Sequence, residues 1–258
     1  MIGVITGVRD GWIVTKRNLY RYIRLPQLII FSSIQPIMFL TLFNFVFGGA
    51  LGASLASGDK YINYLLPGIL VQTILFGALQ TGVGLSRDLN AGIIDRFRSL
   101  PMSRSAVLTG RTTADMVRNI STALILLGMG FVYGFRFHNG AGDAVLMIVM
   151  IIAFGYAFSW VAAFVGLAVK DEETAQLAGF LFIFPLTFAS ATFVPTQTMP
   201  DWLQKFANNQ PVTFAVTAAR HFATGSPSDG AELKLLAWIV GLIIVFVPLS
   251  IYIYKKRG

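Results

Sequence analysis

Six long apolar segments dominate this sequence, and their length determines whether the folded chain lies in water or in a lipid bilayer. They span residues 28–47, 62–85, 119–135, 145–169, 175–194 and 235–254. Each is close to the roughly 20 residues that cross a bilayer as a helix, and the third is the shortest. The alternating segments of about 10 residues that build a membrane β-barrel do not occur. The sequence therefore predicts an all-α integral membrane protein with six transmembrane helices.

The composition agrees with a membrane class. Of 258 residues, 55% are hydrophobic and 12% are charged, whereas about 25% of residues are charged in a typical soluble domain. The mean hydropathy is +0.68. Cysteine is absent, and the histidines His138 and His221 stand far from each other. We therefore expect no disulfide, no metal site and no thiol chemistry.

Lysine and arginine are distributed unevenly between the two predicted sides of the membrane. If the N-terminus is inside, fifteen of the 20 basic residues fall on inner segments and five on outer ones. The outer ones are Lys60, Arg136, Lys205, Arg220 and Lys234. The positive-inside rule then predicts a multi-pass protein of the cytoplasmic membrane with both termini in the cytoplasm. The net charge of +8 is thus a topology signal. Since no basic patch is interleaved with aromatic residues, no nucleic-acid partner is expected.

We expect one domain over residues 1–258. Residues 1–26 are predicted to form a basic amphipathic helix in the inner interface, although a solvated positive flank would look similar. Residues 27–194 hold the first five spans. The loop 195–234 is predicted to be extracellular, with a helix starting at Asp201, a break at Asn208–Pro211 and a second short helix over 212–223, both re-entrant in the outer leaflet. Residues 235–258 form the last span and a basic tail.

The densest charge in the chain lies between the second and third spans, at residues 87–104. At helical spacing, one apolar stripe carries Leu89, Ile93, Phe97 and Leu100. Asp95 and Arg98 fall roughly opposite this stripe, and Pro101 ends the helix. A short amphipathic helix of this kind can dock into a groove on another protein. It can equally rest on lipid headgroups, and the residues alone leave both interpretations open.

The chemistry that the sequence lacks is informative too. It has no phosphate-binding loop of the G-x-x-x-x-G-K-[ST] type. All twelve acidic residues fall in loops or at or near the ends of predicted spans, which disfavours a proton relay. Arg111, Asp115 and Arg118 are spaced to pair along the cytoplasmic extension of the third span. We infer that the energy for any transport comes from another chain.

Polar side chains also interrupt the first two spans, at Gln35, Asn44, Gln72 and Gln80. Such residues commonly bond one helix to another. We favour interhelical contacts for them, and they remain candidates for lining a pathway.

Several motifs resemble a known family. They are Leu-Pro-Gly-Ile-Leu-Val-Gln at 66–72, Gly-Val-Gly-Leu-Ser-Arg-Asp-Leu at 82–89, Gly-Ile-Ile-Asp-Arg-Phe-Arg-Ser-Leu-Pro-Met-Ser-Arg at 92–104, and Leu203 with Asn-Gln-Pro-Val-Thr at 209–213. Together they look like the membrane subunit of ABC-2-type exporters, in the daunorubicin/doxorubicin-resistance permease branch. The Asp-Arg-Phe-Arg-Ser-Leu-Pro run is the most specific part.

The resemblance implies a transport subunit that is not itself an enzyme and binds no cofactor. ATP and Mg would be bound by a separate ATP-binding subunit, present in two copies. A second permease, identical or a paralogue, would complete the transporter, with membrane lipids around it. The segment after the second span would be the coupling helix that docks on the ATPase. Its contact candidates are Asp88, Gly92, Ile93, Asp95, Arg96, Phe97, Arg98, Ser99, Leu100 and Pro101. Lys170, Asp171 and Glu172 would be a second contact, or else an ordinary solvated turn.

The same resemblance places a substrate path between protomers, and we expect the first, second and fifth spans to line it. Candidate residues are Phe43, Phe47, Gln72, Phe76, Phe184, Phe188 and Phe193; ordinary packing or lipid contact would also explain each of them. The expected function is ATP-driven export of an amphipathic drug, antibiotic or lipid-like substrate. The alternatives are export of a polysaccharide or lipid-linked glycan, and an ATP-independent carrier or channel.

Overall fold

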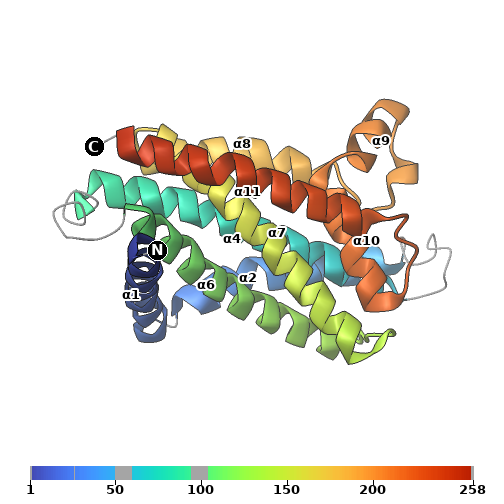
Figure 1. Cartoon of the computed structure of the whole chain (residues 1–258). Coiled ribbons are helices and arrows are strands. Elements are labelled where there is room, and N and C mark those ends of the chain that lie inside the picture. The colour runs from blue at the N-terminus through green and yellow to red at the C-terminus, as the bar shows by residue number, and fades with distance from the viewer. Residues whose placement is uncertain (1, 26, 50–59, 94–103, 257–258) are drawn as a thin grey trace.

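The computed structural model describes residues 2–25, 27–49, 60–93 and 104–256. Every regular element in these ranges is helical (Figure 1). The elements are α1 (Ile2–Arg24), α2 (Gln27–Leu42), the π-helical turn η1 (Phe43–Phe47), α4 (Tyr61–Asn90), α6 (Arg104–Val132), α7 (Gly140–Ala168), α8 (Glu172–Phe188), the 3-10 turn η2 (Thr196–Thr198), α9 (Asp201–Asn208), α10 (Pro211–Thr224) and α11 (Ala231–Lys256). The predicted all-α class is confirmed for this part of the chain.

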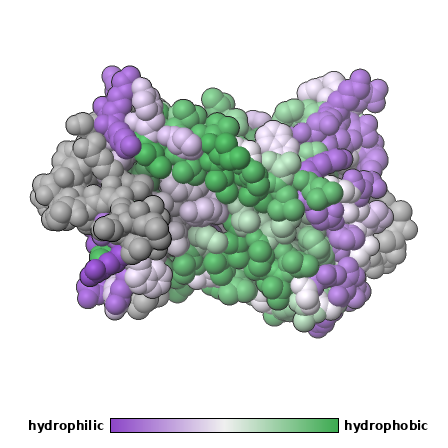
Figure 2. Space-filling model, in the orientation of Figure 1, coloured by the Kyte–Doolittle hydropathy of each residue, from purple (hydrophilic) through white to green (hydrophobic). Residues whose placement is uncertain are grey.

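The surface has the pattern of a multi-pass membrane protein. On the face shown in Figure 2, a hydrophobic band crosses the middle of the bundle, and hydrophilic residues gather at both ends. Within the described ranges, five helices are long and apolar enough to cross a membrane: Ile29–Phe47, α4, Ala106–Val132, α7 and α11. The predicted span 175–194 instead forms the 17-residue helix α8. Pro185 lies in the last turn of α8, and the chain leaves the helix as a turn after Phe188. Segment 175–194 is therefore a shorter helix than predicted.

The bundle has two different ends. The N- and C-termini and the end of α4 lie at one end, here called the terminal end (Figure 1). Helices α9 and α10 lie at the other, here called the distal end. This arrangement agrees with termini on one side of the membrane. Which side faces the cytoplasm stays a prediction.

Helix α4 forms the centre of the bundle and contacts α6, α7, α8 and α10. Its closest approach to α7 depends on Gly82 and Gly166. A Cβ atom at Gly82 would meet the carbonyl oxygen of Ala162, and one at Gly166 would meet the carbonyl oxygen of Gly82. Small residues at such positions let two membrane helices gain van der Waals contact along their backbones.

Helix α1 packs across α6 at the terminal end. Val14 is buried against Gly110, and the hydroxyl of Thr15 donates to the Gly110 carbonyl at 3.3 Å. On the other face Trp12 is 63% exposed, beside the exposed Lys16. The helix predicted for residues 1–26 is thus present and two-faced. Its position in the membrane interface stays a prediction.

The distal end has the two helices that the sequence predicts, one starting at Asp201 and a second after the break; their re-entrant position in the outer leaflet stays a prediction. Gln210 precedes α10, and its side-chain oxygen accepts from the Val212 amide at 3.1 Å. Val212 and Ala215 are buried in the main hydrophobic core. Helix α10 is therefore an integral part of the bundle, while α9 presents Trp202 at 72% exposure.

Arg220 on α10, which the sequence analysis counts among the outer basic residues, is buried. Its Nε donates to the Tyr64 carbonyl at 2.8 Å. Its Nη2 donates to the carbonyls of Ala191 and Thr192 at 2.7 and 3.1 Å. The guanidinium also lies 3.4 Å from the centroid of the Tyr64 ring. One side chain thus joins α10 to α4 and to the turn that follows α8.

Candidate functional site

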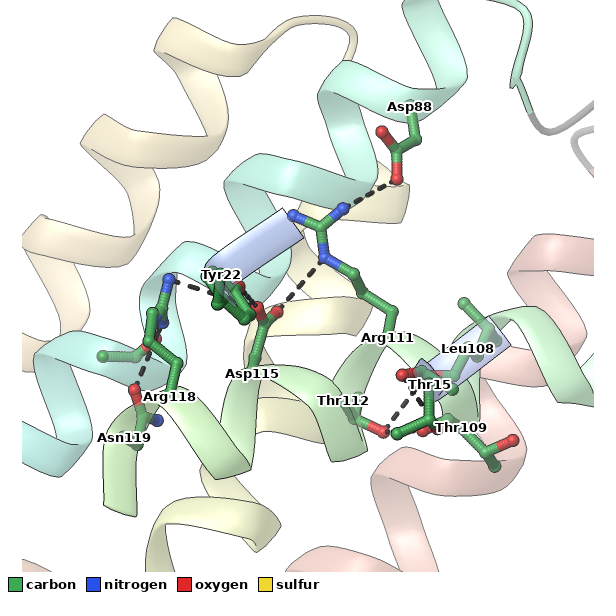
Figure 3. A network of polar contacts seen from close by, with 12 residues as sticks. Thr15, Tyr22, Asp88, Leu108, Thr109, Arg111, Thr112, Asp115, Arg118 and Asn119 are labelled. Carbon is green, nitrogen blue, oxygen red and sulfur yellow. Dashed lines mark hydrogen bonds and ion pairs between the residues drawn. The ribbon is translucent and has the colours of Figure 1, made fainter. Parts of the chain in front are cut away.

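A network of charged residues joins three helices near the terminal end (Figure 3). Asp115 on α6 is fully buried and accepts from Arg111 Nε at 3.2 Å. Arg118 Nη1 lies 4.0 Å from the same carboxylate. Arg111 Nη1 also donates to Asp88 on α4 at 2.8 Å. The predicted pairing of Arg111, Asp115 and Arg118 is confirmed, and it extends across to α4.

Helix α1 contributes Tyr22 to this network. The Tyr22 hydroxyl donates to Asp115 Oδ1 at 2.6 Å. Burial, and next the negative charge of Asp115, raise the pKa of Tyr22 to about 12. The phenol therefore keeps its proton at neutral pH and remains a donor to the carboxylate.

A polar cavity of about 320 Å³ lies beside the network, between α2, α4, α6 and α8. Its lining includes the carboxamides Gln35, Gln72, Gln80, Asn119 and Gln176 and the guanidinium groups of Arg87, Arg111 and Arg118. Phe39, Phe76 and Phe180 form part of its apolar wall. Among the described residues, no aspartate or glutamate lines this cavity.

The glutamine side chains that line the cavity are not hydrogen-bonded to the described part of the protein. Gln35, Gln72, Gln80 and Gln176 form no hydrogen bond with any described residue. Gln72 is nevertheless only 6% exposed. Buried polar groups in proteins nearly always have a hydrogen-bond partner. The interpretation of Gln35, Gln72 and Gln80 as interhelical contacts is therefore wrong for the described chain, and these carboxamides are available to a bound molecule.

A phenylalanine cluster continues from the cavity toward the distal end. Its members are Phe39, Phe43, Phe47, Phe184, Phe188 and Phe193. The ring of Phe193 lies 4.7 Å from that of Phe43 and 5.2 Å from that of Phe188. The cluster therefore connects the end of α2 with α8. Phe39 belongs both to this cluster and to the cavity wall, and its ring lies 6.0 Å from that of Phe43.

The structure thus brings together the residues proposed for the substrate path. Gln72 and Phe76 line the cavity, and the five other candidates belong to the phenylalanine cluster. Sequence reasoning missed Gln176 and Arg118 because both stand at the ends of apolar segments, where a polar residue is unremarkable. It also missed Phe39 and Phe180, since nothing in their local sequence separates them from the other phenylalanines.

Comparison with known proteins identifies the family. The family model described as ABC-2 type transporter matches residues 9–222. The chain belongs to the ABC-2 type transporter family. It is 30% identical to the daunorubicin resistance ABC transporter permease protein DrrB1 of Streptomyces coeruleorubidus, over 94% of this chain and 84% of that protein. It is 26% identical to the doxorubicin resistance ABC transporter permease protein DrrB of Mycobacterium tuberculosis, over 96% of this chain and 90% of that one.

As an ABC-2 permease, the chain is the non-catalytic membrane component of an ABC transporter, a class that works with ATP-binding subunits. The described residues contain no group of three His, Cys, Asp or Glu side chains that could hold a metal ion.

The structure describes only the start of the permease's expected coupling segment. Helix α4 ends at Asn90, and Gly92 follows in a turn with φ of +64°. Leu89 therefore belongs to α4, and the prediction of one continuous apolar stripe from Leu89 is wrong at this turn. A positive φ suits glycine because it has no Cβ atom. Gly92 and Ile93 are half-buried. Asp95, Arg96, Phe97, Arg98, Ser99, Leu100 and Pro101 lie outside the described residues.

Two of the other contact candidates are engaged within the permease itself. Asp88 accepts from Arg111, as above, and Glu172 Oε2 accepts from Arg87 Nε at 2.8 Å. This hydrogen bond lowers the pKa of the Glu172 carboxyl. The Arg87–Glu172 pair connects the end of α4 with the start of α8.

The neighbouring residues in the loop between α7 and α8 are exposed. Asp171 caps α8 by accepting from the Thr174 amide at 2.7 Å. This bond lowers the pKa of Asp171. Lys170 is exposed and has no ion-pair partner among the described residues. The loop thus combines an internal contact at Glu172 with an accessible Lys170–Asp171 surface.

Proposed function

We propose that this chain is the permease subunit of an ATP-driven exporter that moves an amphipathic drug, antibiotic or lipid-like substrate out across the cytoplasmic membrane. ATP hydrolysis takes place on a separate ATP-binding subunit present in two copies. A second permease, identical or a paralogue, completes the transporter. The observation that supports this proposal is the polar cavity, whose apolar wall continues into the phenylalanine cluster.

The cavity and the cluster together match the two parts of an amphiphile. The cavity offers hydrogen-bonding groups at the terminal end. The cluster offers apolar surface toward the distal end, and Phe184 is 50% exposed there. A ligand site of this kind, mostly apolar with a few converging polar groups, is the usual form of a small-molecule pocket.

The charged contacts at the end of α4 supply a route for transmission. The segment proposed to dock on the ATPase follows α4 directly. Arg87 ties this end of α4 to α8, and Asp88 ties it to Arg111 on α6. Since Arg87 and Arg111 also line the cavity, a movement of the docking segment reaches the substrate site through a few side chains.

The test is to co-express the permease with its ATP-binding subunit and reconstitute the complex in proteoliposomes. Asp95→Ala and Arg98→Ala are expected to reduce both subunit association and ATP-dependent transport. Asp201→Ala and Lys205→Ala, one acid and one base exposed on α9 at the distal end, are matched controls and are expected to retain both.

Three results would contradict the proposal or its substrate class. Association and transport that survive Asp95→Ala and Arg98→Ala would show that this segment does not couple the subunits. Transport by the purified permease alone, without the ATP-binding subunit, would make the chain an ATP-independent carrier. Transport of a polysaccharide or lipid-linked glycan in place of amphipathic drugs would show that the proposed substrate class is wrong.

A further inference from the structure

We propose that the polar cavity selects amphiphiles with an anionic headgroup, and that it disfavours cationic ones. This inference rests on the proposed function, because it names the substrate class of the same site. It is carried by three features of the cavity: its basic lining, the position of the neighbouring carboxylates, and its unpaired carboxamides.

The lining is basic on the side that a ligand would touch. Arg87, Arg111 and Arg118 reach the cavity, whereas no described carboxylate does. The carboxylates that pair with these arginines are not among the lining residues: Asp115 is fully buried, Asp88 accepts from Arg111, and Glu172 accepts from Arg87. A cation in the cavity would therefore meet the guanidinium groups before any carboxylate.

Arg118 is the least neutralised of the three arginines. Its nearest described carboxylate oxygen, Asp115 Oδ1, is 4.0 Å away and also accepts from Tyr22, while Arg111 binds the other oxygen of the same carboxylate. Its other contacts are neutral acceptors, the Gly77 carbonyl at 2.9 Å and the Asn119 side-chain oxygen at 3.2 Å. A guanidinium has five N–H donors, so Arg118 keeps donor capacity toward the cavity. Charge-assisted hydrogen bonds to phosphate or carboxylate are the strong contacts that such a group makes.

The carboxamides complete the site. Gln35, Gln72, Gln80 and Gln176 each carry an amide NH₂ with no described acceptor. Together with the arginines, they can surround a phosphate or carboxylate with donors. The cavity volume of about 320 Å³ is at the lower end of the range of ligand pockets, which suits a headgroup. The apolar part of the molecule would leave along Phe39, Phe76 and Phe180.

The test uses the complex of permease and ATP-binding subunit in nanodiscs of neutral phosphatidylcholine. Three probes share one chain and differ in the headgroup: dodecyl phosphate, dodecyl maltoside and dodecyltrimethylammonium, each below its critical micelle concentration. Binding is measured without nucleotide, and stimulation of ATP hydrolysis is measured in parallel. Dodecyl phosphate is expected to bind about tenfold or more tightly than dodecyltrimethylammonium. Inorganic phosphate is the competitor that separates a lipid-like ligand from a free anion, and it is expected not to displace dodecyl phosphate.

Gln80→Glu sharpens the test because Gln80 is exposed to the cavity and the replacement keeps its shape. The variant is expected to weaken dodecyl phosphate and strengthen dodecyltrimethylammonium, which shifts the ratio of their affinities by about tenfold. Gln204→Glu on α9, at the distal end, is the matched control and is expected to leave the ratio unchanged. Arg118→Gln is expected to lower dodecyl phosphate affinity in the same direction as Gln80→Glu.

The two proposals fail in different ways. Equal or tighter binding of the ammonium probe, or an affinity ratio that Gln80→Glu leaves unchanged, overturns the headgroup inference. So does displacement of dodecyl phosphate by inorganic phosphate, which would identify a site for the free anion. Headgroup selectivity without stimulation of ATP hydrolysis by any probe supports the cavity assignment and contradicts the exporter. Stimulation by the ammonium probe alone leaves the exporter standing and overturns the selectivity.

Discussion

Replacing Arg220 by Met is expected to destabilise the distal end of the bundle more than any change of a surface charge. The wild-type side chain donates to three backbone carbonyls, on Tyr64, Ala191 and Thr192. Methionine keeps much of the side-chain volume but has no donor. Leaving a buried acceptor without a donor costs about 1–3 kcal/mol. The Ala191 carbonyl keeps the Tyr64 hydroxyl as a donor at 3.2 Å, and the Tyr64 carbonyl lies within helix α4, so only the Thr192 carbonyl depends on Arg220 among these three. Removing the buried cation also recovers part of its desolvation cost, so we expect a loss of about 1–3 kcal/mol.

The assay is reversible unfolding in mixed detergent micelles, followed by circular dichroism. Arg136→Met is the matched control, because Arg136 also donates to two carbonyls, at 3.0 and 2.7 Å, but is exposed. Its loss is expected to cost less than about 1 kcal/mol, since water satisfies the carbonyls that it leaves. The loss of stability in Arg220→Lys is expected to lie between those of Arg220→Met and Arg136→Met, because the lysine ammonium keeps the charge but lacks the planar arrangement of donors of a guanidinium. Equal stability of Arg220→Met and Arg136→Met would refute this reasoning.

Three further predictions concern the helix contacts. Gly82→Ala places a methyl group against the α7 backbone and is expected to lower the free energy of unfolding by about 1–3 kcal/mol. Gly128→Ala is the control, because a Cβ atom there would meet nothing within 4 Å, and it is expected to be neutral or slightly stabilising. Similar losses of stability for both variants in the same unfolding assay would contradict this prediction. Tyr22→Phe removes the 2.6 Å hydrogen bond to the buried Asp115 carboxylate on α6. It is expected to lower the free energy of unfolding by about 1.5–3 kcal/mol in the same assay. An unchanged unfolding midpoint would show that the bond contributes nothing. The hydrogen bond from Arg87 lowers the pKa of the Glu172 carboxyl. The stability that this bond contributes is therefore present above the ordinary carboxyl pKa and is lost as the pH falls through the lowered pKa. Glu172→Gln is expected to reduce the dependence of stability on pH in this acidic range, and an unchanged dependence would contradict the assignment.

Much of the helix pattern could be predicted because its cause is local. The starts of α9 and α10 follow from Asp201 and Pro211, and a fully apolar stretch has to be a helix when its backbone bonds cannot be made to water. The spacing of Arg111 and Asp115 predicts their pairing in the same way. The break at Gly92 was missed because an apolar stripe on both sides of a glycine reads as one continuous helix.

The candidate site could be predicted only in part. The proposed path residues proved to lie together, although the sequence had nothing to show that Phe43 and Phe193 touch. The glutamines were found but misinterpreted, because a polar residue in a span has the same local signal whether it bonds to a neighbour or faces a cavity. Nothing in the local sequence placed Gln176 at the cavity, and the spacing of Arg118 predicted its pairing with Asp115 but not its place in the cavity lining, since that depends on helices far away in the sequence.

The sequence by itself determined that the chain folds in lipid and that its fold is all-α, because these depend on composition and on the length of the apolar segments. It also carried the motifs that identify the family. Only the tertiary structure decided which polar side chains satisfy one another and which are left facing a cavity. Asp115 and Arg220 are buried for that reason, and the glutamines are not bonded. The hydrogen-bond and ion-pair partners of these side chains come from different helices. Which groups are paired therefore depends on how the helices pack, and the sequence of a single helix does not show it.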